Sequence, residues 1–321
     1  MVSNLFKRKE VEIKFLAVEK LALLYNLFTT LLIILFFNRL DNPQEMLMGR
    51  FFILIGTFTL IYTYTKLPSR FTILLRITLQ MALLNYWYPD TFEFNRIFPN
   101  LDHIFASTEY GLFGCQPAME FENMLSGTLW RELFNMGYWL YFPMVATLSF
   151  YYFFKRPAEV ERCTFTIMAA FFLHYLIYIF LPVAGPQFYF PVIGEEAASS
   201  GIYESIGNHF NLHPDVSIAQ EGKGVFFTEL VNMAQRAGER PTAAFPSSHV
   251  GVAIVMMILA FRGSKKLFLG LLPFFMLLCC ATVYIKAHYL IDALAGTVTG
   301  VLTYILTSWL YKRFLKQKTE M

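Results

Sequence analysis

Long apolar runs recur along most of the chain and are separated by polar stretches. Each has about the length that a helix needs to cross the hydrocarbon core of a membrane, roughly 20 residues. Arg50 and Arg76 fall within two of these runs, so the ends of those two helices are less sharply defined. We predict membrane-spanning helices over Phe15–Phe37, Met46–Thr65, Phe71–Tyr88, Leu133–Phe154, Cys163–Leu181, Ala244–Phe261, Leu267–Ile285 and Tyr289–Tyr311.

The composition favours a membrane protein over two soluble domains, which the length of 321 residues would otherwise allow. Apolar residues make up 56% of the chain and charged residues only 15%, a balance typical of polytopic membrane proteins. We therefore predict an all-α fold, a polytopic bundle of membrane helices. We divide it into an N-terminal part, residues 1–132, with transmembrane helices and an outer amphipathic segment, and a core, residues 133–321.

The lysines and arginines predict the orientation of the helices, because short cytoplasmic loops are enriched in both residue types. If the helices alternate in direction, basic clusters such as Lys7–Lys9, Lys155–Arg156 and Lys265–Lys266 all lie on one side. We expect that side, and both termini, to be cytoplasmic. The two longer polar segments, Pro89–Glu132 and Pro182–Ala243, then lie on the opposite, outer side of the membrane.

The first candidate for chemistry precedes the last apolar run, where Lys286, His288 and Asp292 lie close together in the sequence. His288 and Asp292 are four residues apart, which places both on one face of a helix. The carboxylate can then hold one ring nitrogen and leave the other nitrogen basic. Lys286 adds positive charge near a helix N-terminus, which already favours an anion. On its own, a His-x-x-x-Asp pair is most often structural.

A second polar cluster, Pro246-Ser247-Ser248-His249, begins another apolar helix on the same predicted side of the membrane. Serine hydroxyls and free N–H groups in a first turn are typical of a helix cap. Upstream, Arg240 offers a planar guanidinium that suits phosphate. We expect the amphipathic stretch Gly224–Ala237 to bring Arg240 to the site together with Arg236, although a solvated helix face explains Arg236 more simply.

The two clusters together place two histidines, several cations and hydroxyl donors at the outer ends of separate helices. Charge in such places is costly and is usually functional. The set suits a phosphoryl group, with one imidazole attacking phosphorus and the other transferring the proton of the leaving group. Because cations and backbone donors can stabilise the charge, we expect no metal and no cofactor. His209, His213 and Asp215 could bind a metal, but loop histidines rarely do.

The two clusters resemble the second and third signature motifs of the type 2 phosphatidic acid phosphatase (PAP2) superfamily, whose usual forms are P-S-G-H and S-R-x5-H-x3-D. In this chain Ser248 replaces the glycine of the second motif, and Ala281-Thr282 replaces the serine and arginine of the third. The histidines and the aspartate of both motifs are present. The resemblance covers about Ala169–Gly300.

The first motif of the superfamily, K-x6-R-P, matches only at Arg240-Pro241, and Met233 stands at the lysine position. Lys286 is a plausible replacement for the missing arginine of the third motif. Gln187 stands where related proteins often have arginine. Thr282 and Tyr289 make the third motif look more like that of the inositol-phosphorylceramide-synthase-like branch than that of the phosphatases.

The resemblance implies a PAP2-type bundle of about six helices with two transmembrane helices added at the N-terminus. It also implies that His288 is the nucleophile that becomes phosphohistidine, oriented by Asp292. His249 would protonate the leaving oxygen and later activate water or an acceptor alcohol. The phosphate oxygens would be held by Arg240, Ser247, Ser248 and Lys286, with Arg236 and Gln187 as further candidates.

The predicted function is that of an integral-membrane lipid phosphatase that acts at the outer leaflet. The alternative is a phosphotransferase that moves a phospho-head group onto a ceramide-like alcohol, since both reactions use the same histidines. A transporter for lipid phosphate would need cations but not two histidines and an aspartate. The expected partners are a phospholipid or lipid phosphate and membrane lipids, and not nucleic acid. The resemblance suggests a bacterial inner membrane with the site on the periplasmic side.

Three further features have simpler explanations than chemistry. His174 lies within an apolar run and is better explained by a hydrogen bond to a neighbouring helix than by proton transfer. Gly296 and Gly300 predict close packing of the last helix against another. The amphipathic piece Leu101–Tyr110 is expected to lie on the membrane surface.

Overall fold

The computed structural model describes residues 5–8, 14–213 and 225–315, and this part of the chain is helical without any strand. This agrees with the predicted all-α class. The helices are α1 (Ala17–Leu35), α2 (Pro43–Lys66), α3 (Arg70–Ala82), α4 (Leu84–Asn95), α5 (Asp102–Phe113), α6 (Pro117–Met124), α7 (Thr128–Trp139), α8 (Tyr141–Lys155), α9 (Val160–Phe180), α10 (Pro186–Ile193), α11 (Glu195–Ser199), α12 (His209–Leu212), α13 (Phe226–Gly238), α14 (Ser248–Gly263), α15 (Lys265–Tyr284) and α16 (Leu290–Leu310).

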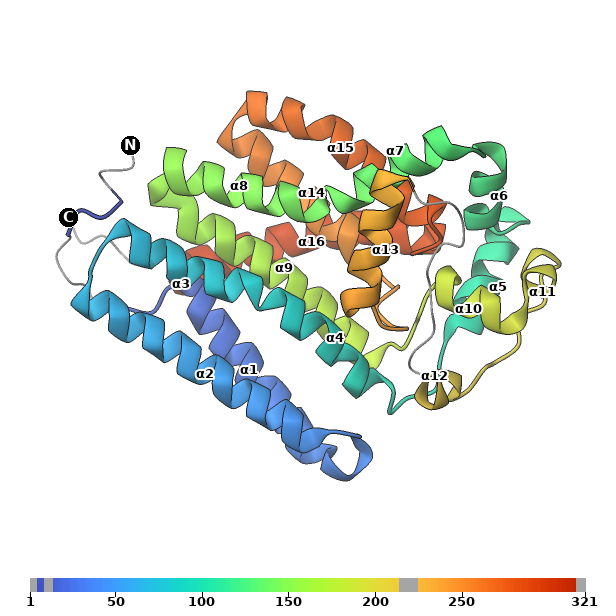
Figure 1. Ribbon diagram of the computed structural model, residues 1–321, viewed down its shortest axis with the longest axis horizontal. Coiled ribbons are helices and arrows are strands. Elements are labelled where there is room, and N and C mark those ends of the chain that lie inside the picture. The colour runs from blue at the N-terminus through green and yellow to red at the C-terminus, as the bar shows by residue number, and fades with distance from the viewer. Residues whose placement is uncertain (1–4, 9–13, 214–224, 316–321) are drawn as a thin grey trace.

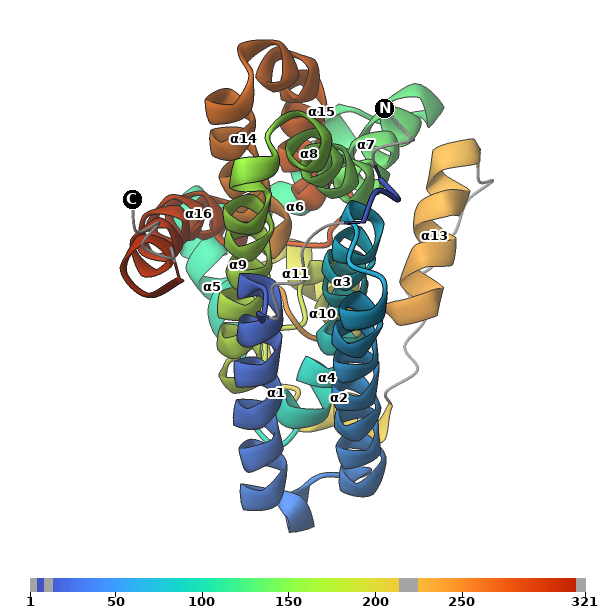
Figure 2. The same ribbon diagram turned by 90° about the vertical axis from the view of Figure 1, so that its left-hand side faces the viewer.

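Helix α9 lies at the centre of the bundle. It packs against α1 and α4 on one side and against α14 and α16 on the other, as Figure 1 shows. In its most apolar stretch 78% of the residues are buried, against 28% in α2, which lies at the edge of the bundle. Figure 2 shows α1 and α2 as a long hairpin beside α9, with α13 on the flank of α3 and α4. An almost entirely buried apolar helix is the natural centre of such a bundle.

Five of the described helices are long and apolar enough to cross a membrane: Ala17–Leu35, Pro43–Lys66, Pro157–Phe180, Lys265–Tyr284 and Leu290–Arg313. Helix α14 is apolar but shorter. Two runs that we predicted as single helices, Phe71–Tyr88 and Leu133–Phe154, are each divided between two helices in the structure, with breaks at Leu83 and Leu140. The six-plus-two arrangement therefore remains a prediction.

Pro143 explains the break at Leu140. A proline has no N–H to donate to the carbonyl four residues earlier, and its ring clashes with that carbonyl. For Pro143 this residue is Trp139, which is the last residue of α7. The chain therefore has a turn at Leu140 before α8 begins.

The two arginines inside predicted spans are both paired within the protein. The guanidinium of Arg50 on α2 makes two hydrogen bonds to the carboxylate of Asp90 on α4, at 3.1 and 2.7 Å. Arg76 on α3 pairs with Glu19 on α1 at 2.6 Å. All four side chains are buried. Because an unpaired charge is costly in an apolar bundle, these ion pairs hold α2 against α4 and α3 against α1.

Glycines let α14 and α16 approach closely. A Cβ added at Gly296 would lie 2.6 Å from the carbonyl oxygen of Ser247, and one at Gly300 would lie 2.5 Å from that of Gly251. The predicted role of Gly296 and Gly300 in helix packing is confirmed. His174 also serves packing, since its Nδ1 contacts the carbonyl of Ala170 at 2.8 Å and its Nε2 lies 3.3 Å from the Thr299 hydroxyl on α16.

Candidate active site

His249 and His288 come from different parts of the fold and meet directly. His249 lies in the first turn of α14, and His288 lies in the short loop between α15 and α16. The Nδ1 atom of His249 is 3.3 Å from Nε2 of His288. The close packing of α14 against α16 brings the two rings together, so the structure unites the two histidines that the motifs singled out.

The imidazole of His288 is oriented through its Nδ1 atom. This atom lies 2.8 Å from the carbonyl oxygen of Ala244 and 3.7 Å from the Asp292 carboxylate. A carbonyl can only accept a hydrogen bond, so Nδ1 of a neutral His288 carries the proton and Nε2 is free of it. Burial lowers the pKa of His288 to about 4, against smaller opposing effects of the Ala244 carbonyl and Glu239. The ring is therefore neutral at ordinary pH, with its basic nitrogen toward His249.

Asp292 lies beside His288 but does not take the closest contact with it. The Oδ2 atom of Asp292 accepts a hydrogen bond of 2.8 Å from the backbone N–H of Tyr289 and so caps the start of α16. Its Oδ1 atom has no hydrogen-bond partner within the described residues. The orienting role expected of Asp292 stays a prediction, and the Ala244 carbonyl is an orienting group that the motif did not indicate.

The ring of His249 lies between two tyrosines. Its centroid is 4.6 Å from that of Tyr138 and 4.7 Å from that of Tyr141. These tyrosines stand on either side of the helix break at Leu140, Tyr138 at the end of α7 and Tyr141 at the start of α8. Residues three apart lie on neighbouring positions of one helix face, and across this break the rings of both tyrosines still contact His249.

The serines of the second motif shape the start of α14. The Ser247 hydroxyl accepts a hydrogen bond from the N–H of Val250 and acts as the helix cap. The N–H of Ser248 donates to the Tyr178 hydroxyl at 2.9 Å. The cap that the sequence suggested is thus present, and it holds His249 at the first turn.

Two of the predicted cations, Lys286 and Arg240, interact with acidic residues, and the third, Arg236, is exposed. Lys286 forms an ion pair with Glu122 at 2.9 Å, and its backbone has a positive φ of 62° in the loop before His288. Arg240 hydrogen-bonds the carbonyl of Glu239 and interacts electrostatically with Glu93 on α4. Arg236 is exposed on α13, which agrees with the simpler explanation of a solvated helix face.

Among the described residues, the charged one that lines the cavity beside His249 is Glu239, whereas the sequence had suggested Arg236 and Arg240 near the site. Glu239 follows α13 and accepts a hydrogen bond of 3.0 Å from Gln187, which in turn accepts one of 3.2 Å from Gln235. Glu239 is close enough to His288 for the two to interact electrostatically. Burial raises the pKa of Glu239, and the hydrogen bonds lower it by less. The spacing of four residues between Gln235 and Glu239 was the available sequence signal for this pair.

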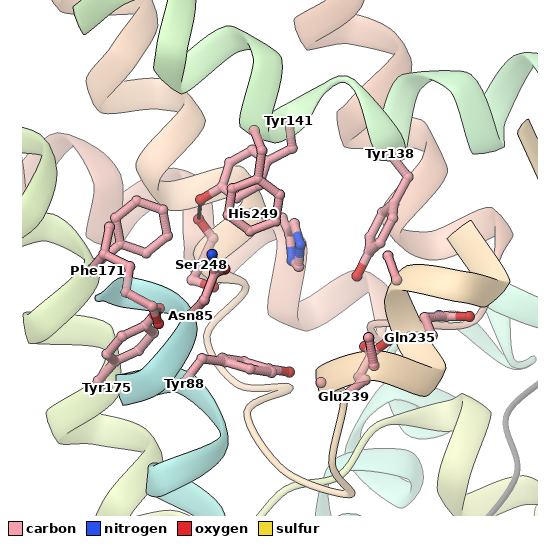
Figure 3. Close-up of a pocket in the computed structure, with 15 residues that line it drawn as sticks. Asn85, Tyr88, Tyr138, Tyr141, Phe171, Tyr175, Gln235, Glu239, Ser248 and His249 are labelled. Atoms are coloured by element: carbon pink, nitrogen blue, oxygen red, sulfur yellow. Dashed lines mark hydrogen bonds between the residues drawn. The ribbon is translucent and has the colours of Figure 1, made fainter. Parts of the chain in front are cut away.

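A cavity of about 300 Å³ opens beside His249. Its walls come from α4, α7, α8, α9, α13 and the start of α14, so the N-terminal helices contribute to the site as well. Figure 3 shows His249 facing this space, with tyrosines around it and Gln235 and Glu239 at one side. Its lining is mainly aromatic and apolar: Leu84, Asn85, Tyr88, Tyr138, Tyr141, Phe142, Phe171, Tyr175, Ala234, Gln235, Ala237, Gly238, Glu239, Ser248 and His249.

Helix α5 braces the site with two buried carboxylates that sequence analysis left aside. Asp102 accepts hydrogen bonds from the backbone N–H groups of Ala184 and Gly185, at 2.7 and 2.8 Å, and from the Tyr289 hydroxyl at 3.0 Å. Glu109 accepts one of 3.1 Å from the N–H of Ile291.

These contacts show that the acidic face of the piece Leu101–Tyr110 packs against the protein, and its expected position on the membrane surface stays a prediction. In α5 the buried residues are Asp102, Ala106 and Glu109, whereas Ile104 is exposed. The acidic residues spaced at helical intervals were the available signal. The two carboxylates hold the loop before α10 and the start of α16 in place around His288. They accept hydrogen bonds from backbone N–H groups near the starts of α10 and α16, which have no partner within those helices.

No group of three or more potential metal ligands occurs within the described residues. His209 and His213 have ring centroids 4.7 Å apart. Asp215, the third residue considered as a ligand, lies outside the described part of the chain.

Comparison with known proteins adds one positive finding. A family model described as the PAP2 superfamily matches residues 114–306, a range that contains both histidines and begins after α5. Searches among curated proteins and among solved structures return no significant match.

Proposed function

The chain belongs to the PAP2 superfamily, and on this premise we propose that it is an integral-membrane lipid phosphatase that works through a phosphohistidine intermediate. The proposal rests on one observation above all, the contact between Nδ1 of His249 and Nε2 of His288 at 3.3 Å. Two imidazoles from separate parts of the fold, one of them neutral with its basic nitrogen toward the other, are suited to nucleophilic attack and proton transfer at one phosphorus.

In the first step of the proposed reaction, Nε2 of His288 forms a bond to phosphorus and the bond from phosphorus to the lipid oxygen breaks. His249 enters this step as the imidazolium, gives its proton to the leaving oxygen and becomes neutral, ready to act as the base of the second step. The hydrogen bond from Nδ1 of His288 to the Ala244 carbonyl keeps the ring in the attacking tautomer and stabilises the positive charge that develops on it.

In the second step, His249 takes a proton from water as the water oxygen attacks phosphorus. The bond from phosphorus to His288 breaks, and inorganic phosphate leaves. The cavity beside His249 is apolar over much of its wall, which suits the lipid alcohol that leaves in the first step.

Phosphate contacts are assigned in this proposal to Ser247, Ser248, Arg240 and Lys286, with Arg236 and Gln187 as weaker candidates. The start of α14 supports it, because the first turn of a helix favours an anion. Lys286 would exchange its partner Glu122 for a phosphate oxygen. That ion pair is partly exposed, and such a pair contributes little free energy, about 1 kcal/mol or less.

Transfer to an alcohol is the second candidate. The same cavity that accommodates a leaving lipid alcohol lies on the side of His249, the proposed general base. An acceptor alcohol of ceramide type in this cavity would attack the intermediate in place of water. Hydrolysis releases inorganic phosphate or a water-soluble phosphate ester, whereas transfer moves a labelled head group onto added ceramide, so the products separate the two reactions.

The decisive experiment measures phosphate release from phosphatidate by the purified protein in detergent. His288→Ala should lower kcat by about 10³-fold or more, and an acid-labile phosphoenzyme should form in the unchanged protein but not in this variant. His213→Ala removes an exposed histidine and should leave the rate unchanged. Full turnover in His288→Ala would refute the mechanism.

We place the protein in a bacterial inner membrane with the site on the periplasmic side and both termini in the cytoplasm. The distribution of lysine and arginine supports this orientation. In a Cys115→Ser background, a membrane-impermeant thiol reagent should label a cysteine introduced at exposed Ser200 but not one at exposed Lys266. The reverse pattern in intact cells would invert the orientation.

A further inference from the structure

The cavity beside His249 combines aromatic rings with one carboxylate. Among its described lining residues there is no lysine or arginine, and Glu239 is the residue that brings a formal negative charge. A lining with a carboxylate and without cations does not favour the binding of free phosphate. Tyr88, Tyr138 and Tyr141 are among the rings that surround the space. Aromatic rings and a carboxylate together are the groups that proteins use to bind organic ammonium ions.

Neutral amides orient the Glu239 carboxylate without compensating its charge. Gln187 donates a hydrogen bond of 3.0 Å to Oε1, and Gln235 holds Gln187 in turn. Besides these amides, the carboxylate interacts electrostatically with His288, which is neutral at ordinary pH, and with uncharged tyrosines. A carboxylate on a cavity wall without a counter-ion attracts a cationic ligand.

Two tyrosines lie close enough to Glu239 to contribute aromatic rings to a site for an organic cation. Tyr88 on α4 and Tyr138 at the end of α7 both interact electrostatically with Glu239. Figure 3 shows them reaching from different walls of the cavity toward the side on which Glu239 lies. Tyr138 also contacts His249, with ring centroids 4.6 Å apart. The carboxylate, two rings and a reacting histidine therefore border one space.

We propose that this cavity binds a quaternary or primary ammonium group of the substrate, and that Glu239 determines this specificity. The inference rests on the proposed function and narrows it to lipids that carry an ammonium group a few atoms from the phosphorus. The ammonium could belong to a choline-type head group or to an amino alcohol that forms the lipid part. Glu239 acts on binding and takes no part in the transfer of the phosphoryl group.

Binding is tested without turnover, through the thermal stability of the purified protein during titration with choline and with 3,3-dimethylbutan-1-ol, its uncharged isostere. Choline should stabilise the protein and the isostere should not. Glu239→Gln keeps the shape of the side chain and should weaken choline binding about tenfold or more. Glu229→Gln, the same change on the exposed side of α13, should bind choline unchanged.

Tyr88→Leu serves as a second variant should Glu239→Gln fail to fold, since it removes a ring and keeps the carboxylate. It should weaken choline binding several-fold. Equal binding of choline and its isostere, or choline binding unaffected by whichever of the two variants folds, would overturn the inference.

Turnover then distinguishes the two sources of the ammonium. Phosphatidylcholine and a long-chain 2-amino alcohol phosphate are compared with phosphatidate as substrates, in wild type and in Glu239→Gln. In the variant the preferred ammonium substrate should lose its advantage in kcat/KM over phosphatidate. If phosphatidate is hydrolysed best and equally by both proteins, the ammonium inference fails and the phosphatase stands. If His288→Ala retains turnover, the proposed mechanism is refuted, and the choline titration still tests the ammonium site on its own.

Discussion

Gly296→Ala tests whether the approach of α14 to α16 sets the geometry of the histidine pair. The added Cβ would lie 2.6 Å from the Ser247 carbonyl oxygen, whereas ordinary contact begins at 3.4 Å. The two backbones must therefore separate by about 0.8 Å at this point, since a carbonyl cannot rotate away as a side chain can. Ser247 is the cap of the helix that begins with Ser248 and His249.

Such a shift has two consequences of different size. Overpacking a close helix contact costs about 1–3 kcal/mol of stability. A displacement of about 1 Å between reacting groups can lower the rate about 100-fold. We therefore expect Gly296→Ala to lower kcat for phosphate release from phosphatidate by one to two orders of magnitude, roughly, while the protein remains folded.

The assay pairs this rate with the denaturation midpoint of the same preparation in detergent. Gly270→Ala on α15 is the matched control, because a Cβ there meets nothing within 4 Å, and this variant should be as active and as stable as the wild type, or slightly more stable. A Gly296→Ala protein with unchanged rate and midpoint would show that the close approach of the helices does not position the histidines.

Three further predictions follow from charges in the structure. Asp102→Asn should cost roughly 3 kcal/mol of unfolding free energy in a denaturant titration, since an amide cannot accept from all the donors around this carboxylate; an unchanged midpoint would contradict it. The kcat/KM profile should fall on the acid side with an apparent pKa of about 4, because protonation of His288 removes its nucleophilic form; a fall near the ordinary value of about 6.5 would contradict it. Asp90→Asn should destabilise the protein by about 3–5 kcal/mol by leaving Arg50 unpaired in the bundle, whereas Asp41→Asn at a more exposed ion pair should change stability by about 1 kcal/mol or less; equal effects would argue against a buried charge at Arg50.

Much of the architecture could be predicted from the chain because apolar length and helical spacing are local properties. A run of apolar residues long enough to span a membrane needs no knowledge of its neighbours, and five of the expected spans have helices of sufficient length. The close packing at Gly296 and Gly300 was visible for the same reason, since small residues four apart share one face. Positions of helix breaks were less visible, because the run around Leu140 remains apolar through Pro143.

The sequence by itself determined that two histidine-bearing motifs begin helices, and hence which residues were candidates for chemistry. Only the tertiary structure decided what surrounds them. The spacing of His288 and Asp292 predicted a shared helical face, but His288 lies in the loop before α16. The Ala244 carbonyl, 44 residues away along the chain, lies closer to its ring than Asp292 does. The packing of α13 against α7 leaves Arg236 on the outside, and the chain that leaves the helix places Glu239 at the cavity. Such non-local contacts depend on three-dimensional packing, which no local pattern of residues specifies.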